Sequence, residues 1–136
     1  MQASLELQQA LVAALDGNAA LAARGLKALD GPPPDSRAPY LSIGPEMVRA
    51  RGFRGGRTSE HRLSVTYWDA RGAMGAAKAV LAEVERAVLA MPRTLPTARI
   101  LSLESAGAAV RRGPRDWTQA VLDVRALVVM ETQDGD

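Results

Sequence analysis

The chain has 136 residues, of which 47% are hydrophobic and 24% charged, and this length and composition fit one globular domain over residues 1–136. Its formal net charge of +2 is too small to indicate nucleic-acid binding. It has no cysteine and one histidine, His61, which excludes disulfides, thiolate chemistry and metal sites that need two imidazoles. No apolar run approaches the roughly 20 residues that cross a bilayer, and the N-terminus lacks a signal-peptide pattern, so we expect a cytoplasmic chain without a membrane partner.

The N-terminal segment predicts an amphipathic helix over residues 3–15. Ser4 is its predicted N-cap, and Asp16-Gly17 is its predicted stop. The residues that share its apolar face at helical spacing are Leu7, Leu11, Ala14 and Leu15.

A short helical turn and a stiff connection follow. Asn18 is a suitable cap for a turn over residues 19–23, which Gly25 ends. The run Asp-Gly-Pro-Pro-Pro-Asp at residues 30–35 excludes a helix or a central strand, because proline fixes φ and lacks an amide donor. We expect this run to be an extended connection.

Two strands are predicted on either side of an arginine- and glycine-rich loop. Residues 40–43 read as the first strand, closed by Gly44-Pro45. Residues 49–60 show no period and contain three glycines, which predicts a loop that is mobile in the isolated subunit. Residues 61–68 alternate in polarity, as expected of a half-buried strand.

Residues 73–91 carry the strongest helical pattern in the chain, and Pro92 ends it. Lys78, Glu85 and Arg86 occupy its polar side. Its apolar stripe consists of Met74, Ala77, Leu81, Val84, Val88 and Met91.

The C-terminal third predicts two more strands. The first covers residues 99–104, with Leu101 and Leu103 on one face, and the second covers residues 117–131, where alternate residues from Ala120 to Met130 are apolar. An Ala/Gly/Arg-rich connection separates them, and residues 132–136 read as a frayed tail.

This order of elements predicts an α+β fold: a mostly antiparallel four-stranded sheet with two main helices packed on one face. Leu127 and Val129 interrupt the polar face of the last strand and make its end apolar on both sides. Trp68 lies on the polar face of its own strand, where an indole can anchor an interface. We therefore expect Trp68, Leu127 and Val129 at a subunit interface.

The residues needed for catalysis do not gather in the sequence. His61 stands beside Glu60 at a strand start, and we interpret it as a surface or strand-edge histidine instead of a general base. Gly52, Gly55 and Gly56 are not followed by the lysine and hydroxyl residue of a P-loop. We expect no enzyme activity, catalytic residue, metal site or cofactor.

The loop region of residues 49–62 is the one strongly basic segment. It carries five arginines against Glu60 alone, and Phe53 could stack on a base. Two interpretations stay open: contact with a nucleic-acid backbone, or a solvated loop whose arginines pair with carboxylates of the same or a neighbouring subunit. The arginines concerned are Arg49, Arg51, Arg54, Arg57 and Arg62.

Taken along the chain, several segments resemble one known family. They are the Leu-rich first helix, the Pro-rich connection, the strand Pro-Tyr-Leu-Ser-Ile-Gly at residues 39–44, the glycine-bearing turn before the second helix and the last strand beginning Trp-Thr-Gln-Ala-Val-Leu-Asp-Val. This order resembles the tail completion or tail terminator proteins of long-tailed phages, prophages and gene transfer agents. The Arg/Gly loop is not a hallmark of that family, so no role of this loop is inherited from it.

The resemblance implies a structural subunit without a cofactor. Members of the family form hexameric rings that cap the finished tail tube, stop its polymerisation and join it to the head connector, with DNA passing through the lumen. The implied partners are further copies of the chain, the tube protein, the connector protein and DNA, and the implied location is the head–tail junction of the virion or phage-like particle. The alternative is a small nucleic-acid-binding module that uses the basic loop of residues 49–62.

Overall fold

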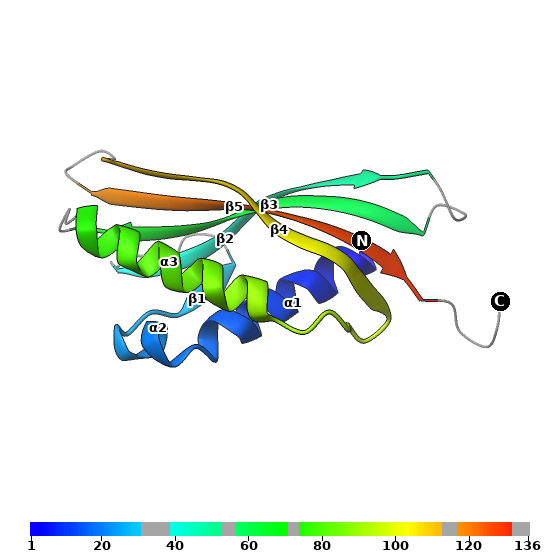
Figure 1. Ribbon diagram of the computed structural model, residues 1–136, viewed down its shortest axis with the longest axis horizontal. Helices are drawn as coiled ribbons and strands as arrows, with labels where there is room; N and C mark the ends of the chain where they lie inside the picture. The colour runs from blue at the N-terminus through cyan, green and yellow to red at the C-terminus, as the bar shows by residue number, and fades with distance from the viewer. Residues whose placement is uncertain (31–38, 53–56, 71–73, 113–116, 132–136) are drawn as a thin grey trace.

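The computed structural model describes residues 1–30, 39–52, 57–70, 74–112 and 117–131. These residues form an α+β fold with three helices and five strands (Figure 1). In chain order the elements are α1 (Gln2–Asp16), α2 (Ala19–Ala23), β1 (Ala28–Asp30), β2 (Tyr40–Ala50), β3 (Thr58–Asp69), α3 (Met74–Ala90), β4 (Ala98–Arg112) and β5 (Thr118–Met130).

All three helices lie on one face of the sheet and leave the other face open (Figure 1). The strand order is β1-β2-β3-β5-β4, with β1 parallel to β2 and every other neighbouring pair antiparallel. The α+β class and the one-sided helix layer agree with the sequence prediction. The expected four strands and two main helices are corrected to a mixed sheet of five strands and three helices among the described residues.

The predicted helices are confirmed, with one correction at the start of α1. Its N-cap is Met1, without a side-chain hydrogen bond, and Ser4 is instead buried with its hydroxyl bonded to Glu46. Asn18 caps α2 as predicted, because its side chain accepts a hydrogen bond from the Leu21 amide at 2.9 Å. Gly25 follows with φ +74°, a conformation that glycine adopts without strain.

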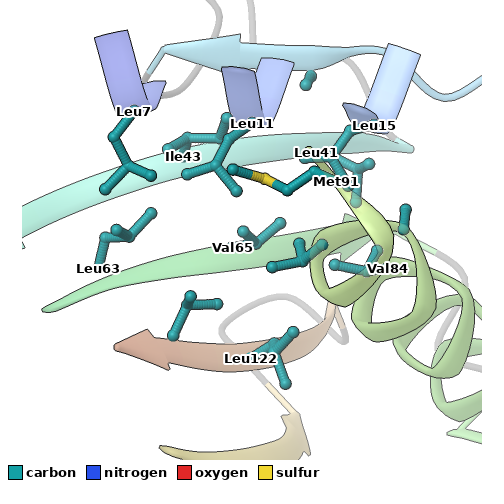
Figure 2. Packing of buried hydrophobic residues seen from close by; sticks show 14 of the residues in the cluster. Leu7, Leu11, Leu15, Leu41, Ile43, Leu63, Val65, Val84, Met91 and Leu122 are labelled. Carbon is teal, nitrogen blue, oxygen red and sulfur yellow. The ribbon is translucent and has the colours of Figure 1, made fainter. Parts of the chain in front are cut away.

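The helices and the sheet bury one continuous apolar core. The leucines of α1 point toward β2 and β3, and Val84 of α3 lies close to Leu122 of β5 (Figure 2). The fully buried members of this core, each with a relative exposure under 2%, include Leu7, Leu11, Leu15, Val65, Val80, Val84 and Val124.

Strand β2 is longer than predicted and contains an irregularity. The sequence closed the first strand at Gly44-Pro45, but β2 passes through this pair, whose peptide is cis, and continues to Ala50. Its pairing with β3 shifts register between Ile43 and Glu46. A bulge lets a strand absorb a proline without ending, because the missing amide donor falls where the ladder is already interrupted.

Strand β4 is also longer than predicted. The sequence predicted residues 99–104, whereas β4 pairs with β5 from Ala98 to Arg112, so the Ala/Gly/Arg-rich segment is largely strand. A register shift beside Leu101 changes the alternation: Leu101 is 46% exposed, and Leu103 packs against the core. The prediction that these two leucines share a face was wrong.

Three predicted segments cannot be compared with the structure. Most of the Pro-rich connection at residues 30–35, the turn at residues 113–116 and the tail at residues 132–136 lie outside the described residues.

Gly44→Ala is expected to lower the free energy of unfolding by about 1–2 kcal/mol, measured by urea unfolding. Gly44 has φ +122°, which a side chain rarely adopts, and an added Cβ would meet nothing within 4 Å, so the loss comes from the backbone alone. Gly75→Ala in α3 is the matched control, because its Cβ would also enter open space at an ordinary φ. Equal losses in both variants would contradict this explanation.

Candidate functional site

The basic segment is divided between two strands and a shorter loop than predicted. Arg49 lies on β2 and Arg62 on β3, so the described part of the loop between these strands is Arg51, Gly52 and Arg57. Arg54 and Phe53 lie outside the described residues. The prediction that residues 49–60 are one irregular loop was therefore wrong at both ends.

Glu60 pairs with several of the nearby arginines. Its carboxylate accepts hydrogen bonds from Arg51 at 3.1 Å and from Arg62 at 3.2 Å, and Arg125 of β5 lies 4.0 Å away. The hydrogen bond from Arg62 and the three arginine charges hold the pKa of Glu60 below its ordinary value. Two of the five predicted arginines thus pair within the subunit, whereas Arg49 is exposed and has no ion pair among the described residues.

Trp68 belongs to an aromatic cluster at one end of the sheet. Its ring stacks with Tyr40 at a centroid distance of 6.3 Å and meets Trp117 edge-on at the same distance. The indole N–H donates to the Ser42 hydroxyl at 3.3 Å. Trp68 stays partly exposed, so the cluster combines a rigid apolar body with some accessible surface.

Leu127 and Val129 lie on β5 opposite Glu60 and Thr58 of β3. Both are partly exposed, whereas Val128 between them is fully buried on the other side of the sheet. The predicted two-sided apolar end of the last strand is therefore present. Trp68 lies at the opposite end of β3, so the structure does not gather the three predicted interface residues into one patch.

The structure reveals a buried polar network that the sequence prediction missed. His61 is 0% exposed, which overturns its interpretation as a surface or strand-edge residue. Its Nδ1 lies 2.9 Å from the Glu46 carboxylate and its Nε2 lies 2.7 Å from the Ser59 hydroxyl. Ser4 of α1 donates to the other oxygen of Glu46.

This network connects the first helix to the sheet. Burial raises the pKa of Glu46, but the hydrogen bonds from His61 and Ser4 outweigh it and hold the pKa below its ordinary value. In the tautomer whose Nδ1–H donates to the Glu46 carboxylate, Nε2 accepts a hydrogen bond from the Ser59 hydroxyl. The order hydroxyl, imidazole, carboxylate is that of a hydrolase triad, but here the ring is fully enclosed, and we interpret the contacts as structural.

The alternation of the sequence contained a signal for this burial. Leu63, Val65 and Tyr67 are core residues on the helix-covered side of β3, and His61 continues the same series by one step. Extending the period by two residues would have placed the imidazole inside. Glu46 lies 15 positions from His61 in sequence, and Ser4 lies 42 positions from Glu46, so no local pattern predicts these contacts.

Glu6 forms a second buried connection, between α1 and the segment before β4. Its carboxylate accepts hydrogen bonds from the Thr97 amide at 2.9 Å, from the Thr97 hydroxyl and from the Gln2 amide at 2.7 Å. These bonds, with Gln2 contributing most, hold the pKa of Glu6 below its ordinary value of 4.5. The first turns of α1 are thus joined to β2 through Ser4 and Glu46, and to the segment before β4 through Glu6 and Thr97.

Stability is expected to fall on acidification, and Glu6→Gln should make the fall smaller. A carboxyl whose pKa is lower in the folded than in the unfolded chain stabilises fully above the unfolded pKa, and this contribution disappears as pH falls through the folded pKa. Unfolding by urea at a series of pH values from about 7 to about 3 measures the slope. A Glu6→Gln variant with an unchanged slope would show that Glu6 does not contribute.

The open face of the sheet carries charges and a shallow hollow. Asp123 accepts a hydrogen bond from Ser64 at 2.7 Å, and Arg125 bonds to Glu104. The hollow, of about 460 Å³, is bordered by the two strand irregularities, with Pro45 on one side and Ala106 on the other. No group of three metal-ligating side chains, and no helix long and apolar enough to span a membrane, occurs in the described ranges.

Together these features define a small α+β domain in which buried carboxylates join the first helix to the rest of the fold and one face of the sheet carries no helix. The family model described as tail completion protein gp17 matches residues 9–129, so this chain belongs to that family. The resemblance seen in the sequence is confirmed.

Solved structures agree with this assignment. A chain in the virion of a native gene transfer agent particle is 26% identical, with a TM-score of 0.79 over 93% of this chain and 96% of that one. The gp17 protein of bacteriophage SPP1 shares the fold at 18% identity, with a TM-score of 0.59 over 100% of this chain and 96% of its own. No curated protein sequence matches the chain.

Proposed function

We propose that this chain is a non-enzymatic structural subunit that closes the tail tube of a phage or phage-like particle and joins it to the head connector. The observation that carries the proposal is the family match over residues 9–129, supported by the similarity over 93% of the chain to a component of a gene transfer agent virion. Further copies of the chain, the tube protein and the connector protein are the proposed partners.

The arrangement of the fold supports a geometric role. The buried contacts of Ser4 with Glu46 and of Glu6 with Thr97 connect α1 to β2 and to the segment before β4, and much of the long outer strand β4 remains exposed. We propose that copies of the chain form a ring at the head–tail junction, with the six subunits that the family resemblance implies. A ring requires heterologous contacts that close after a fixed rotation.

Deletion of the gene in the producing host tests this function. Without the cap we expect heads that lack tails and tubes of uncontrolled length, counted by electron microscopy, and we expect a plasmid copy of the wild-type chain to restore normal particles. Normal particles assembled in its absence would contradict the proposal. Turnover of a small molecule by the purified chain would contradict the proposal that the chain is not an enzyme.

The ring is tested separately in solution. Light scattering and negative-stain imaging of the purified chain, alone and with tube protein, are expected to show one discrete oligomer with a central opening. A chain that stays monomeric under both conditions and is absent from particles would contradict the ring.

We further propose that DNA passes through the lumen close to the arginines of residues 49–62. Arg49 and Arg57 are exposed, and Arg51 keeps 44% of its side chain exposed despite its pairing with Glu60. The triple replacement of Arg51, Arg54 and Arg57 by Ser is expected to weaken salt-dependent DNA binding, measured by fluorescence anisotropy at two salt concentrations.

The matched control replaces three arginines far from this segment in sequence: Arg86, Arg93 and Arg99. If both triples reduce binding equally, net charge alone explains it and the loop has no special role. If neither triple changes binding, the contact with DNA is excluded, and with it the alternative function as a nucleic-acid-binding module.

A further inference from the structure

On each side of the sheet, part of one strand edge is unpaired among the described residues: on β2, beyond the short β1, and on β4. β1 pairs only with Leu41–Ile43 of β2, and beyond the irregularity residues 46–50 have no partner on their outer side among the described residues. β4 is covered at its start by the turn before it, where the Ile100 amide donates to the Arg93 carbonyl at 2.7 Å. Residues 101–112 of β4 have no such partner in the described ranges.

Unpaired strand edges bind other strands readily, because each outward backbone amide and carbonyl still lacks a hydrogen-bond partner other than water. Proteins often protect an edge with charged or inward-turned residues. Here the two edges carry exposed apolar side chains as well as charged ones: Met47 at 63% and Val48 at 38% on β2, and Leu101 at 46% on β4.

The directions of the strands make the two edges compatible. β2, β3, β5 and β4 alternate in direction, since each neighbouring pair is antiparallel. β4 therefore runs opposite to β2. If β4 of one copy is placed beside β2 of the next, with the open faces on the same side, the alternation continues without a break.

The charges at the two edges are also complementary. Arg49 is opposite Glu60 in the register and lies on the same face as Met47, which is opposite Arg62. Across the sheet, Glu104 of β4 is opposite Arg125, which is in turn opposite Arg62, so Glu104 shares that face. The β2 edge thus presents the guanidinium of Arg49 on one side of the sheet. On the same side the β4 edge presents the carboxylate of Glu104, which also accepts a hydrogen bond from Arg125 of its own subunit.

We propose that a second copy of this chain binds at these edges: residues 103–107 of β4 in one copy pair antiparallel with residues 46–50 of β2 in the next, with Arg49 facing Glu104. The contact uses two different surfaces on opposite edges, so it is heterologous and repeats from copy to copy until rotation closes it. This inference rests on the proposed function and names the interface of the proposed ring.

Engineered disulfides test the pairing directly. The chain has no cysteine, so introduced cysteines are the only thiols. Opposite residues of an antiparallel pair have Cα atoms about 4.5–5.5 Å apart, within the range that a disulfide bridges. Arg49→Cys and Glu104→Cys replace exposed residues, and circular dichroism would confirm that both variants fold.

The two single variants are mixed under assembly conditions, on tube protein if required, and oxidised. We expect an Arg49→Cys/Glu104→Cys heterodimer on a non-reducing gel, and a ladder of multimers from the double variant. Lys78→Cys, at an exposed position of α3, is the matched control. Mixed with Glu104→Cys, it is expected to form no crosslink.

A charge exchange gives an independent measurement. Arg49→Glu and Glu104→Arg are each expected to weaken assembly by about two- to fivefold, because a cross-strand ion pair contributes modestly. The combined variant should recover the part of the loss that comes from the contact between subunits; Glu104→Arg also removes the bond from Arg125, which the exchange does not restore. A combined variant that assembles worse than either single one would contradict the facing of these two residues.

The outcomes separate this inference from the proposed function. Glu104→Cys crosslinked to itself would indicate a two-fold β4–β4 contact, and crosslinks to tube protein alone would give the edge a different occupant; each overturns the inference. Rings and normal particles without the Arg49–Glu104 crosslink would also overturn it, while the proposed function stands. Two results together would overturn both the inference and the proposed function: the purified chain does not assemble, alone or on tube protein, and particles are normal after gene deletion.

Discussion

Leu11→Ala is expected to lower the free energy of unfolding by about 3–4 kcal/mol. Leu11 is 0% exposed and points from α1 into the core between Leu7 and Leu15 (Figure 2). Truncation removes its buried methyl groups and leaves a cavity that the surrounding helix and strands fill only partly. Urea unfolding followed by circular dichroism measures the loss.

Leu5→Ala is the matched control for this prediction. It makes the same chemical change on the same helix, but Leu5 is 49% exposed, so we expect a change within about 0.5 kcal/mol. Similar losses in the two variants would show that the loss in Leu11→Ala does not come from the buried face of α1, since alanine is itself a good helix former. A small loss in Leu11→Ala alone would contradict the packing of α1 on the sheet.

His61→Leu is expected to destabilise the chain by about 2–3 kcal/mol, because it removes a hydrogen bond to an ionised group and leaves the Glu46 carboxylate without its buried partner. Glu46→Gln should also destabilise, since the amide cannot replace the charged acceptor. Ser64→Ala is the control on the same strand, where the hydroxyl bonds to Asp123 at an exposed position. We expect this control to change stability by less than about 1 kcal/mol.

A double-mutant cycle shows whether His61 and Glu46 act together. If the imidazole and the carboxylate stabilise the fold through each other, the double variant loses less than the sum of the two single losses, by about 1 kcal/mol or more. Additive losses would mean that His61 contributes independently of Glu46, through packing or through its hydrogen bond with Ser59. The same urea measurements provide all four free energies.

The elements with a strong period were predicted well. The leucine spacing of α1, the apolar stripe of α3 and the alternation of β5 each reflect burial of one face, and periods of 3.6 and 2 are readable without knowledge of the partner. Asn18 and Gly25 were also predicted correctly, because a cap and a left-handed glycine act within a few residues. The family was recognisable because its segments follow one another in a characteristic order.

The elements without a period were missed or shortened. The Ala- and Gly-rich half of β4 offers few large side chains to alternate, and its strand state comes from pairing with β5. β2 continues past Gly44-Pro45 because β3 lies alongside it and the register shift accommodates the proline. β1, a three-residue strand, exists only as a partner of β2.

The sequence by itself determined the helical faces, the last strand and the absence of cysteine chemistry, since these depend on neighbouring residues or on composition. Only the tertiary structure decided that Ser4 bonds to Glu46 instead of capping α1, that His61 is enclosed, and that Glu60 neutralises part of the arginine segment. Each of these depends on which distant group the chain brings within hydrogen-bond range, and a buried polar atom takes whatever partner the fold supplies.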